Sequence, residues 1–442
     1  MTVIHSPFEP TYHSPADKRR PKIQPRSWLC QMRTVVIGFI AASSWAGTQG
    51  FTEGDLDVMR GRPVILLSAL SLSLGLPLLG LWWAGKPVAP YLAWPPTTRS
   101  VVHAPFSWPV FVGVMLFICA TLAPFVLRIL QATPRERPIP VAAFPWWGWG
   151  AAIWTLVLWG LAWTRFEWMQ PFQAHTFFPL WVGYIVLVNA LTFRRTGRCM
   201  VLNRPRYFAS LFPLSAGFWW CFEYLNRFVQ NWYYLGGGEL SAGAYVLSAT
   251  LPFSTVLPAV LGTAEWLTAY PRYSAGLDQF VRLRFSHQRV WGWVMLVSAA
   301  GGLVGLGVWP DYLFPLVWVA PLLLITSLQL IHHESTIFSG TVHGDWRTLW
   351  AAAVAALICG CFWEMWNFYS LARWEYAVPF VHGATLFQMP LLGYAGYLPF
   401  GLECLAVADL CLAQKFSGGV AYYGLPGADG GFAQRKPTVA DR

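Results

Sequence analysis

Glu364 and Asn367 lie inside the stretch FWEMWNFYSLARWEY (362–376), directly behind the apolar run LWAAAVAALICGC. Residues three apart share one face of a helix, so the Asn367 amide can hold the Glu364 carboxyl or a ligand beside it. An ionisable group inside a membrane helix is costly and is therefore a candidate functional residue. A carboxylic acid held away from water favours its neutral form and can protonate a substrate that also lies in hydrocarbon. The pattern indicates general acid or base chemistry within a membrane.

A second stretch, WWCFEYLNRFVQNWYY (219–234), repeats the same polar residues. Each stretch has a glutamate, an asparagine three residues later, and then a Trp-x-Tyr motif. These residues are Glu223, Asn226, Trp232 and Tyr234 in the earlier stretch, and Glu364, Asn367, Trp374 and Tyr376 in the later one. The aromatic rings can stabilise a developing carbocation through their faces. The alternative is a belt of Trp and Tyr at the membrane interface.

The similarity continues downstream, where LPFSTVLPAVLGTAEWL (251–267) aligns without a gap on MPLLGYAGYLPFGLECL (389–405). The alignment equates Glu265 with Glu403, so each copy offers a second acid. Prolines interrupt both segments, and such breaks are tolerated in a membrane where the backbone is buried in protein or lines a cavity. They are Pro252, Pro258, Pro390 and Pro399. We expect a cavity beside the four acids, between the two copies.

The elements that position these residues are membrane-spanning helices. The 442-residue chain is 56% hydrophobic and only 11% charged, which excludes an ordinary soluble protein. A span needs about 20 mostly apolar residues, and ten segments reach or approach that length. They are residues 63–84, 109–131, 146–164, 177–193, 207–226, 245–267, 290–308, 313–331, 348–369 and 387–412. An eleventh, 34–50, is short and contains Ser, Thr and Gly.

We therefore predict an all-α, polytopic membrane bundle of about ten spans, or eleven if 34–50 also crosses. Residues 146–270 and 290–412 are interpreted as two copies of one four-helix unit. Four spans return the chain to the side where it began, so the repeats are parallel and related by an axis along the membrane normal. Two or three further helices within 34–135 precede them. A basic extension (1–33) and a flexible tail (413–442) complete the organisation.

The formal net charge of +10 does not indicate nucleic-acid binding, because the positive residues fall in every second loop. That distribution follows the positive-inside rule and predicts cytoplasmic termini. The eight cysteines lack paired metal spacing and are interpreted as small apolar residues. The sequence leaves the oligomeric state open.

We expect no metal and no cofactor. Di-iron bundles use Glu-x-x-His, whereas this chain offers Glu-x-x-Asn, and Asn is a poor ligand for iron or zinc. A second group of possible ligands follows residue 331: His332, His333, Glu334 and His343. We interpret them by default as solvated loop residues and not as a metal site. No Walker loop, nucleophile elbow or dinucleotide fingerprint occurs in a suitable context.

The order Glu, Trp-x-Tyr, Pro and Glu resembles that of the polytopic carotenoid cyclase and hydratase families, over residues 223–265 and 364–403. The resemblance implies intramembrane acids that protonate or hydrate isoprenoid double bonds. Those cyclases typically carry adjacent acids after the proline, whereas this chain has a single Glu265 or Glu403. The WE-x-WN motif also resembles uncharacterised bacterial membrane proteins, which implies a bacterial cytoplasmic membrane.

Three functions remain open from the sequence. The leading hypothesis is an enzyme that acts on an apolar lipid or isoprenoid, with the four glutamates as catalytic groups and the asparagines and Trp-x-Tyr motifs as substrate-binding groups. The first alternative is a proton-coupled or small-solute carrier, in which acids at matching depth load and release a proton. The second is a scaffold whose polar residues only join helices.

Overall fold

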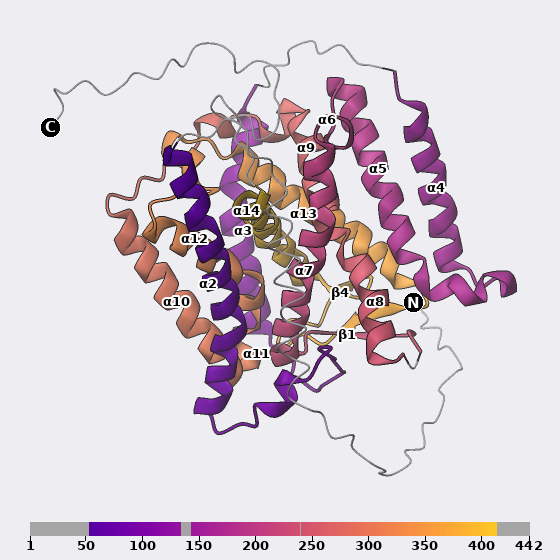
Figure 1. The fold of residues 1–442 in the computed structure, drawn as a ribbon, viewed down its shortest axis with the longest axis horizontal. Coiled ribbons are helices and arrows are strands. Elements are labelled where there is room, and N and C mark those ends of the chain that lie inside the picture. The colour runs from indigo at the N-terminus through magenta and orange to yellow at the C-terminus, as the bar shows by residue number, and fades with distance from the viewer. Residues whose placement is uncertain (1–52, 134–142, 239, 413–442) are drawn as a thin grey trace.

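The computed structural model describes residues 53–133, 143–238 and 240–412 (Figure 1). In these ranges the chain forms long helices, short 3-10 helices and four short strands. The α-helices are α2 (Glu53–Trp83), α3 (Trp108–Gln131), α4 (Trp146–Trp163), α5 (Phe177–Thr196), α6 (Met200–Asn203), α7 (Pro205–Val229), α8 (Ala242–Phe253), α9 (Val256–Thr268), α10 (Gln288–Val308), α11 (Pro310–Leu313), α12 (Ala320–Ile331), α13 (Arg347–Phe368) and α14 (Tyr397–Leu412). The strands are β1 (Trp232–Leu235), β2 (Arg373–Tyr376), β3 (Thr385–Leu386) and β4 (Met389–Pro390). The 3-10 helices are η1 (Ala89–Leu92), η2 (Glu167–His175), η3 (Pro271–Ser274), η4 (Leu277–Gln279), η5 (Phe314–Trp318), η6 (Ser339–His343) and η7 (Leu391–Gly396).

Seven helical segments of the described chain are long and apolar enough to cross a membrane. They are Gly61–Trp83, Trp108–Gln131, Phe177–Thr196, Ala242–Thr268, Gln288–Val308, Arg347–Phe368 and Leu391–Leu412. An eighth forms if Pro310–Trp318 and Ala320–Ile331, which meet at 58°, make one broken span. This composition fits an integral, multi-pass membrane protein and confirms the helical class.

Every one of the ten predicted segments contains helix, but α4 and α7 are not among the seven. Helix α4 is only 18 residues long and rich in Trp and Gly, and α7 carries charged residues and an internal proline. The predicted extension 1–33, the doubtful segment 34–50 and the tail 413–442 lie outside the described residues.

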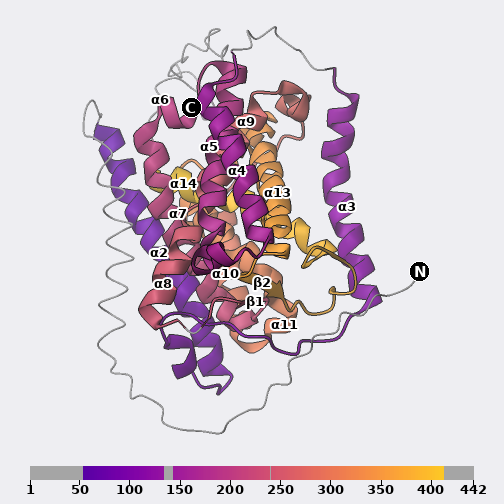
Figure 2. The ribbon, with the colours of Figure 1, turned by 90° about the vertical axis from the view of Figure 1, so that its right-hand side faces the viewer.

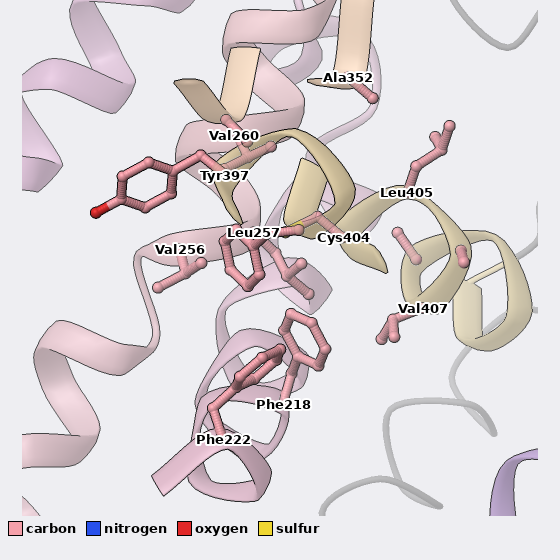
Figure 3. Packing of buried hydrophobic residues seen from close by; sticks show 14 of the residues in the cluster. Phe218, Phe222, Val256, Leu257, Val260, Ala352, Tyr397, Cys404, Leu405 and Val407 are labelled. Atoms are coloured by element: carbon pink, nitrogen blue, oxygen red, sulfur yellow. The ribbon is translucent and has the colours of Figure 1, made fainter. Parts of the chain in front are cut away.

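The helices run side by side between two ends of the molecule, with β1, α8 and α11 near one end and α6 near the other (Figure 1). Helix α3 stands apart from the rest, as the turned view shows (Figure 2), and none of its residues is buried. A long apolar helix with no buried residue fits a helix surrounded by lipid. The core lies instead between α7, α9, α13 and α14 (Figure 3).

Close packing in this core depends on small residues, because a glycine lets two helix backbones approach. At Gly401 of α14, an added Cβ would fall inside contact distance of the Ala352 carbonyl oxygen of α13. Gly160 of α4, in contrast, has open space where a Cβ would stand. The two glycines are a matched pair for testing the α13–α14 contact.

Gly401→Ala is therefore expected to destabilise the protein by on the order of 1–3 kcal/mol, the usual effect of overpacking. Gly160→Ala should be neutral, or stabilising by up to about 1 kcal/mol, because Ala favours a helix more than Gly does. Thermal unfolding of both variants in one neutral detergent measures the difference. Equal melting temperatures would contradict the close approach of α13 and α14.

The strands are a departure from the predicted all-helical bundle. β1 pairs antiparallel with β2, and β3 with β4. The Trp-x-Tyr motifs, expected at helix ends, form β1 and β2. Alternation along a strand sends residues i and i+2 to the same side, so Trp and Tyr of each motif share a face.

Candidate functional site

Glu223 lies near the end of α7 and is fully buried. Three side chains donate hydrogen bonds to its Oε1 atom: Trp219 Nε1 at 3.0 Å, Trp232 Nε1 at 3.0 Å and Tyr234 OH at 2.5 Å. Its Oε2 atom is buried and has no hydrogen-bond partner among the described residues. Buried polar atoms are usually paired, so an unpaired carboxyl oxygen is consistent with a proton-bearing or ligand-binding atom.

Glu364 has a similar environment near the end of α13, where it is also fully buried. Tyr376 OH and Tyr397 OH donate to its Oε1 atom at 2.6 Å and 2.8 Å, while Trp374 Nε1 donates to Tyr376 OH at 2.9 Å. Its Oε2 atom likewise has no partner in the described part of the chain. Each glutamate is thus joined to the Tyr of its own Trp-x-Tyr motif.

Asn226 and Asn367 hold the strands and do not bond the glutamates, in contrast to the predicted contact. Asn226 Nδ2 donates to Trp232 O at 2.8 Å, and Asn367 Nδ2 donates to Trp374 O at 2.7 Å. Their Oδ1 atoms accept from backbone amides, Asn231 N just before β1 at 2.8 Å and Trp374 N of β2 at 2.8 Å. The amides therefore fix the turn after each helix and set the position of the aromatic residues.

The pairing of β1 with β2 brings the two motifs together. Trp232 lies opposite Tyr376, and Tyr234 lies opposite Trp374. In both pairs the Trp of one motif lies opposite the Tyr of the other motif. The register is therefore symmetric with respect to the two strands. Trp219 and Trp363, from α7 and α13, lie 6.5 Å apart between ring centroids and link the two glutamate clusters.

A cavity of about 690 Å³ opens beside these clusters, at the end of the molecule that holds the strands. Its size is typical of a site for a small organic molecule. Aromatic rings form a large part of its wall: Phe177, Phe178, Trp219, Trp232, Tyr234, Tyr245, Phe253, Trp318, Trp363, Trp374, Tyr376 and Tyr397. The Trp-x-Tyr motifs thus face the cavity and the acids.

Aromatic packing closes the cavity toward the middle of the bundle. Phe222 lies 5.3 Å from Trp318 and 5.4 Å from Phe400, between ring centroids. Phe218 stacks on Phe400 at 5.9 Å. Beside Phe218 and Phe222, the buried side chains of α9 and α14 pack together, and Tyr397 turns its hydroxyl away from them (Figure 3).

Glu265 and Glu403 lie away from this cavity, so the expectation that four acids meet in one chamber is not met. Glu403 follows Tyr397 by six residues on α14, roughly 9 Å further along the helix axis. It is fully buried and accepts one bond, from Leu322 N at 3.3 Å. Glu265 lies near the far end of α9, where it pairs with Arg204 at 2.6 Å and accepts from Met200 N at 3.2 Å. Their environments also differ from one another.

Two of the four predicted proline breaks occur, at Pro252 and Pro390, whereas Pro258 and Pro399 lie inside α9 and α14 and do not interrupt them. Helix α8 ends at Phe253 and α9 begins at Val256, and Pro252 lines the cavity. In the later segment, Pro390 ends β4, and α14 begins only at Tyr397. Irregular backbone at both places leaves room for side chains to converge on the cavity.

Three residues of the site were missed by the sequence analysis. Trp219 stands one helical turn before Glu223, a spacing that marks a shared face and gave a usable signal. Tyr397 donates to Glu364 across 33 residues of sequence, and Trp318 comes from η5. No local pattern marks the last two, because only the packing of separate helices brings them to the cavity.

A polar group lies on the face of the strand pair opposite the Trp-x-Tyr side chains, with Arg373 at the edge of the cavity. Tyr233 OH donates to Glu375 Oε2 at 2.9 Å, and Arg373 Nη2 donates to Glu375 Oε1 at 3.1 Å. Burial, with a further contribution from Glu375, raises the pKa of the Tyr233 hydroxyl, so it remains a proton donor. Arg373 is the member of this group that lines the cavity.

No group of three or more metal-binding side chains occurs within the described ranges. Glu334, one member of the histidine-containing group in the sequence, lies instead 3.7 Å from Arg62 of α2. The comparisons with known proteins add no relationship: no family model matches the chain, and no significant match is found among curated proteins or solved structures.

Proposed function

We propose that the protein is a multi-pass membrane enzyme that acts on an apolar lipid, such as an isoprenoid, by moving protons through its glutamate–tyrosine pairs. One observation carries the proposal. Tyr234, Tyr376 and Tyr397 line an aromatic cavity, and their hydroxyls donate to two fully buried carboxyl groups. A proton can therefore pass between a buried acid and a bound substrate through a hydroxyl that contacts both.

The aromatic wall suits the same chemistry. Protonation of a carbon–carbon double bond creates a carbocation, and ring faces attract positive charge within about 6 Å of their centroids. A cavity built largely from indole and phenyl rings offers such faces on several sides. Its mainly apolar lining also offers few groups that would hold water beside the cation, which favours rearrangement or loss of a proton to the second acid.

The aromatic packing that closes the cavity toward the middle of the bundle favours an enzyme over a carrier. The packed rings of Phe222, Trp318 and Phe400 separate the cavity from the opposite end of the bundle. A carrier in this conformation would need those rings to part before any solute could cross.

We also propose that the two halves are parallel repeats in a bundle of ten spans. The symmetric register of β1 and β2 supports an axis between residues 146–270 and 290–412. The matching amide bonds of Asn226 and Asn367 support the same relation. Under the positive-inside rule, the cavity then opens on the outer side of a bacterial cytoplasmic membrane, and the C-terminus is cytoplasmic.

Comparative lipid extraction tests the enzyme. Cells that produce the wild-type protein should contain a lipid product that is missing from cells without the gene, and the matching substrate should accumulate in the latter. Glu167→Gln, at an exposed position of η2, is the control and should leave the product unchanged. Identical lipid profiles with and without the gene would reject the enzyme. In that case, pH-dependent solute flux in vesicles that contain the protein would identify a carrier. Loss of proteins that co-purify with it would identify a scaffold.

A further inference from the structure

The cavity wall is apolar except at one place. Of the described residues that line it, only Arg373 carries a permanent charge. His175, exposed at the end of η2, is the other basic lining residue, and no described lining residue is acidic. Glu239 lies outside the described residues. A single cation beside an aromatic chamber is the arrangement expected for an amphiphile with one anionic end.

Arg373 is held by an ion pair that a ligand can replace. Its Nε and Nη2 atoms donate to Glu375 Oε1 at 3.3 Å and 3.1 Å. The Arg373 and Glu375 side chains are 34% and 26% exposed. Ion pairs this accessible contribute little stability, with typical values of about 0–1 kcal/mol. An anion that approaches from the cavity can therefore compete with Glu375 for the guanidinium.

Two other arginines at this end of the molecule are bound to backbone carbonyls. Arg227 donates to Tyr91 O and Ala93 O, each at 2.6 Å. Arg165 donates to Tyr369 O at 2.6 Å and to Ala162 O at 3.0 Å. Neither lines the cavity. Arg373 is distinguished from both by its position on the wall and by a carboxylate partner that Tyr233 holds from the other side.

We propose that the cavity binds an amphiphile with one anionic end group, a phosphate or a carboxylate, and that Arg373 binds this group at the mouth. The apolar chain of the ligand then lies along the aromatic wall, toward the two glutamate–tyrosine pairs. The inference rests on the cavity of the proposed function, but it does not depend on any reaction there. When the cavity is empty, the Glu375 carboxylate accepts from Arg373 and keeps its guanidinium oriented.

Quenching of tryptophan fluorescence in the purified full-length protein tests this assignment, because Trp residues line the cavity. The probes are an ω-brominated alkyl phosphate, the carboxylate and the alcohol of equal chain length, and inorganic phosphate. The two anionic amphiphiles should quench saturably and bind about 10-fold more tightly than the alcohol, as one charge-assisted contact predicts. Inorganic phosphate at the same concentration should neither quench nor displace them.

Two variants are expected to change the alkyl phosphate affinity in opposite directions. Arg373→Gln should weaken it about 10-fold, to the level of the alcohol, and Glu375→Gln should tighten it a few-fold by removing the competitor. Arg373→Lys should keep part of the preference, because it keeps the charge but loses the bidentate geometry.

Equal binding of phosphate and alcohol amphiphiles to the wild type would overturn the inference, and so would unchanged binding in Arg373→Gln. Displacement by inorganic phosphate at matched concentration would indicate a site for the free ion and would also overturn it. If Arg373→Gln fails to fold, weaker or unchanged binding in Glu375→Gln decides against the proposal. Binding is measured without turnover, so a selective cavity with an unaltered lipid profile would reject only the enzyme.

Discussion

Lipid conversion is expected to fall at least about 100-fold when Glu223 and Glu364 are both replaced by Gln, the usual range for loss of general acid–base catalysis. Gln keeps the volume of Glu, and its amide oxygen can still accept from Tyr234, Tyr376 and Tyr397. The amide has no proton that it can transfer at neutral pH. The substitution thus removes the chemistry and preserves the hydrogen bonds that hold the aromatic wall.

Each single variant should lose nearly as much activity as the double variant. Two acids beside one cavity suit a reaction in which one group gives a proton and the other accepts one, and residues that act as a unit have non-additive effects. A large loss in only one single variant would assign the proton transfer to that acid alone. Conversion is measured as product formed per amount of purified protein in lipid nanodiscs.

The control for this pair is the exposed Glu167→Gln together with the melting temperature of every variant. Wild-type conversion by a folded double variant would exclude both acids from the reaction. If the double variant unfolds, Tyr376→Phe and Tyr234→Phe become the test. These substitutions remove the hydroxyls that donate to the two acids and leave both carboxyls in place.

The second large effect is expected from filling the cavity. Helix α8 presents Ala242, Tyr245, Ala249 and Pro252 to it, at the spacing of one helical face. Ala249→Trp places an indole inside the chamber, so it should lower lipid conversion and lipid binding by at least about 10-fold, since an overfilled site excludes its ligand. Conversion and quenching by a brominated lipid measure both effects.

Ala244→Trp is the matched control, because Ala244 lies on the same helix, is exposed and does not line the cavity. It should leave conversion and binding near wild-type values. Full activity in Ala249→Trp would show that the substrate binds elsewhere. The cavity beside the acids would then not be the site of the reaction.

Much of the fold follows from local sequence. The ten predicted segments all contain helix because apolar runs of sufficient length have few other stable forms in a membrane. The junction between α8 and α9 was indicated by Pro252 and Pro258, which lie on either side of it and each lack a backbone N–H donor. Glu223 and Glu364 were found because an acid inside an apolar helix is conspicuous in the sequence alone.

Alignment of the two copies could not show where their equivalent residues would point. Glu265 and Glu403 occupy matching positions, but one pairs with Arg204 and the other is enclosed near the start of α12. Asn226 and Asn367 stand one turn from their glutamates, but their amides are taken by the strand backbone that follows. Helical spacing fixes a shared face and leaves the choice of partner to the surrounding elements.

The sequence by itself determined a helical membrane chain with two buried acids, each followed by a Trp-x-Tyr motif, because these features depend on the polarity and spacing of neighbouring residues. Only the tertiary structure decided that the motifs pair as β1 and β2, that Tyr397 joins Glu364, and that Arg373 lines an aromatic cavity. Those contacts join residues far apart in the chain, so they exist only after separate helices pack together.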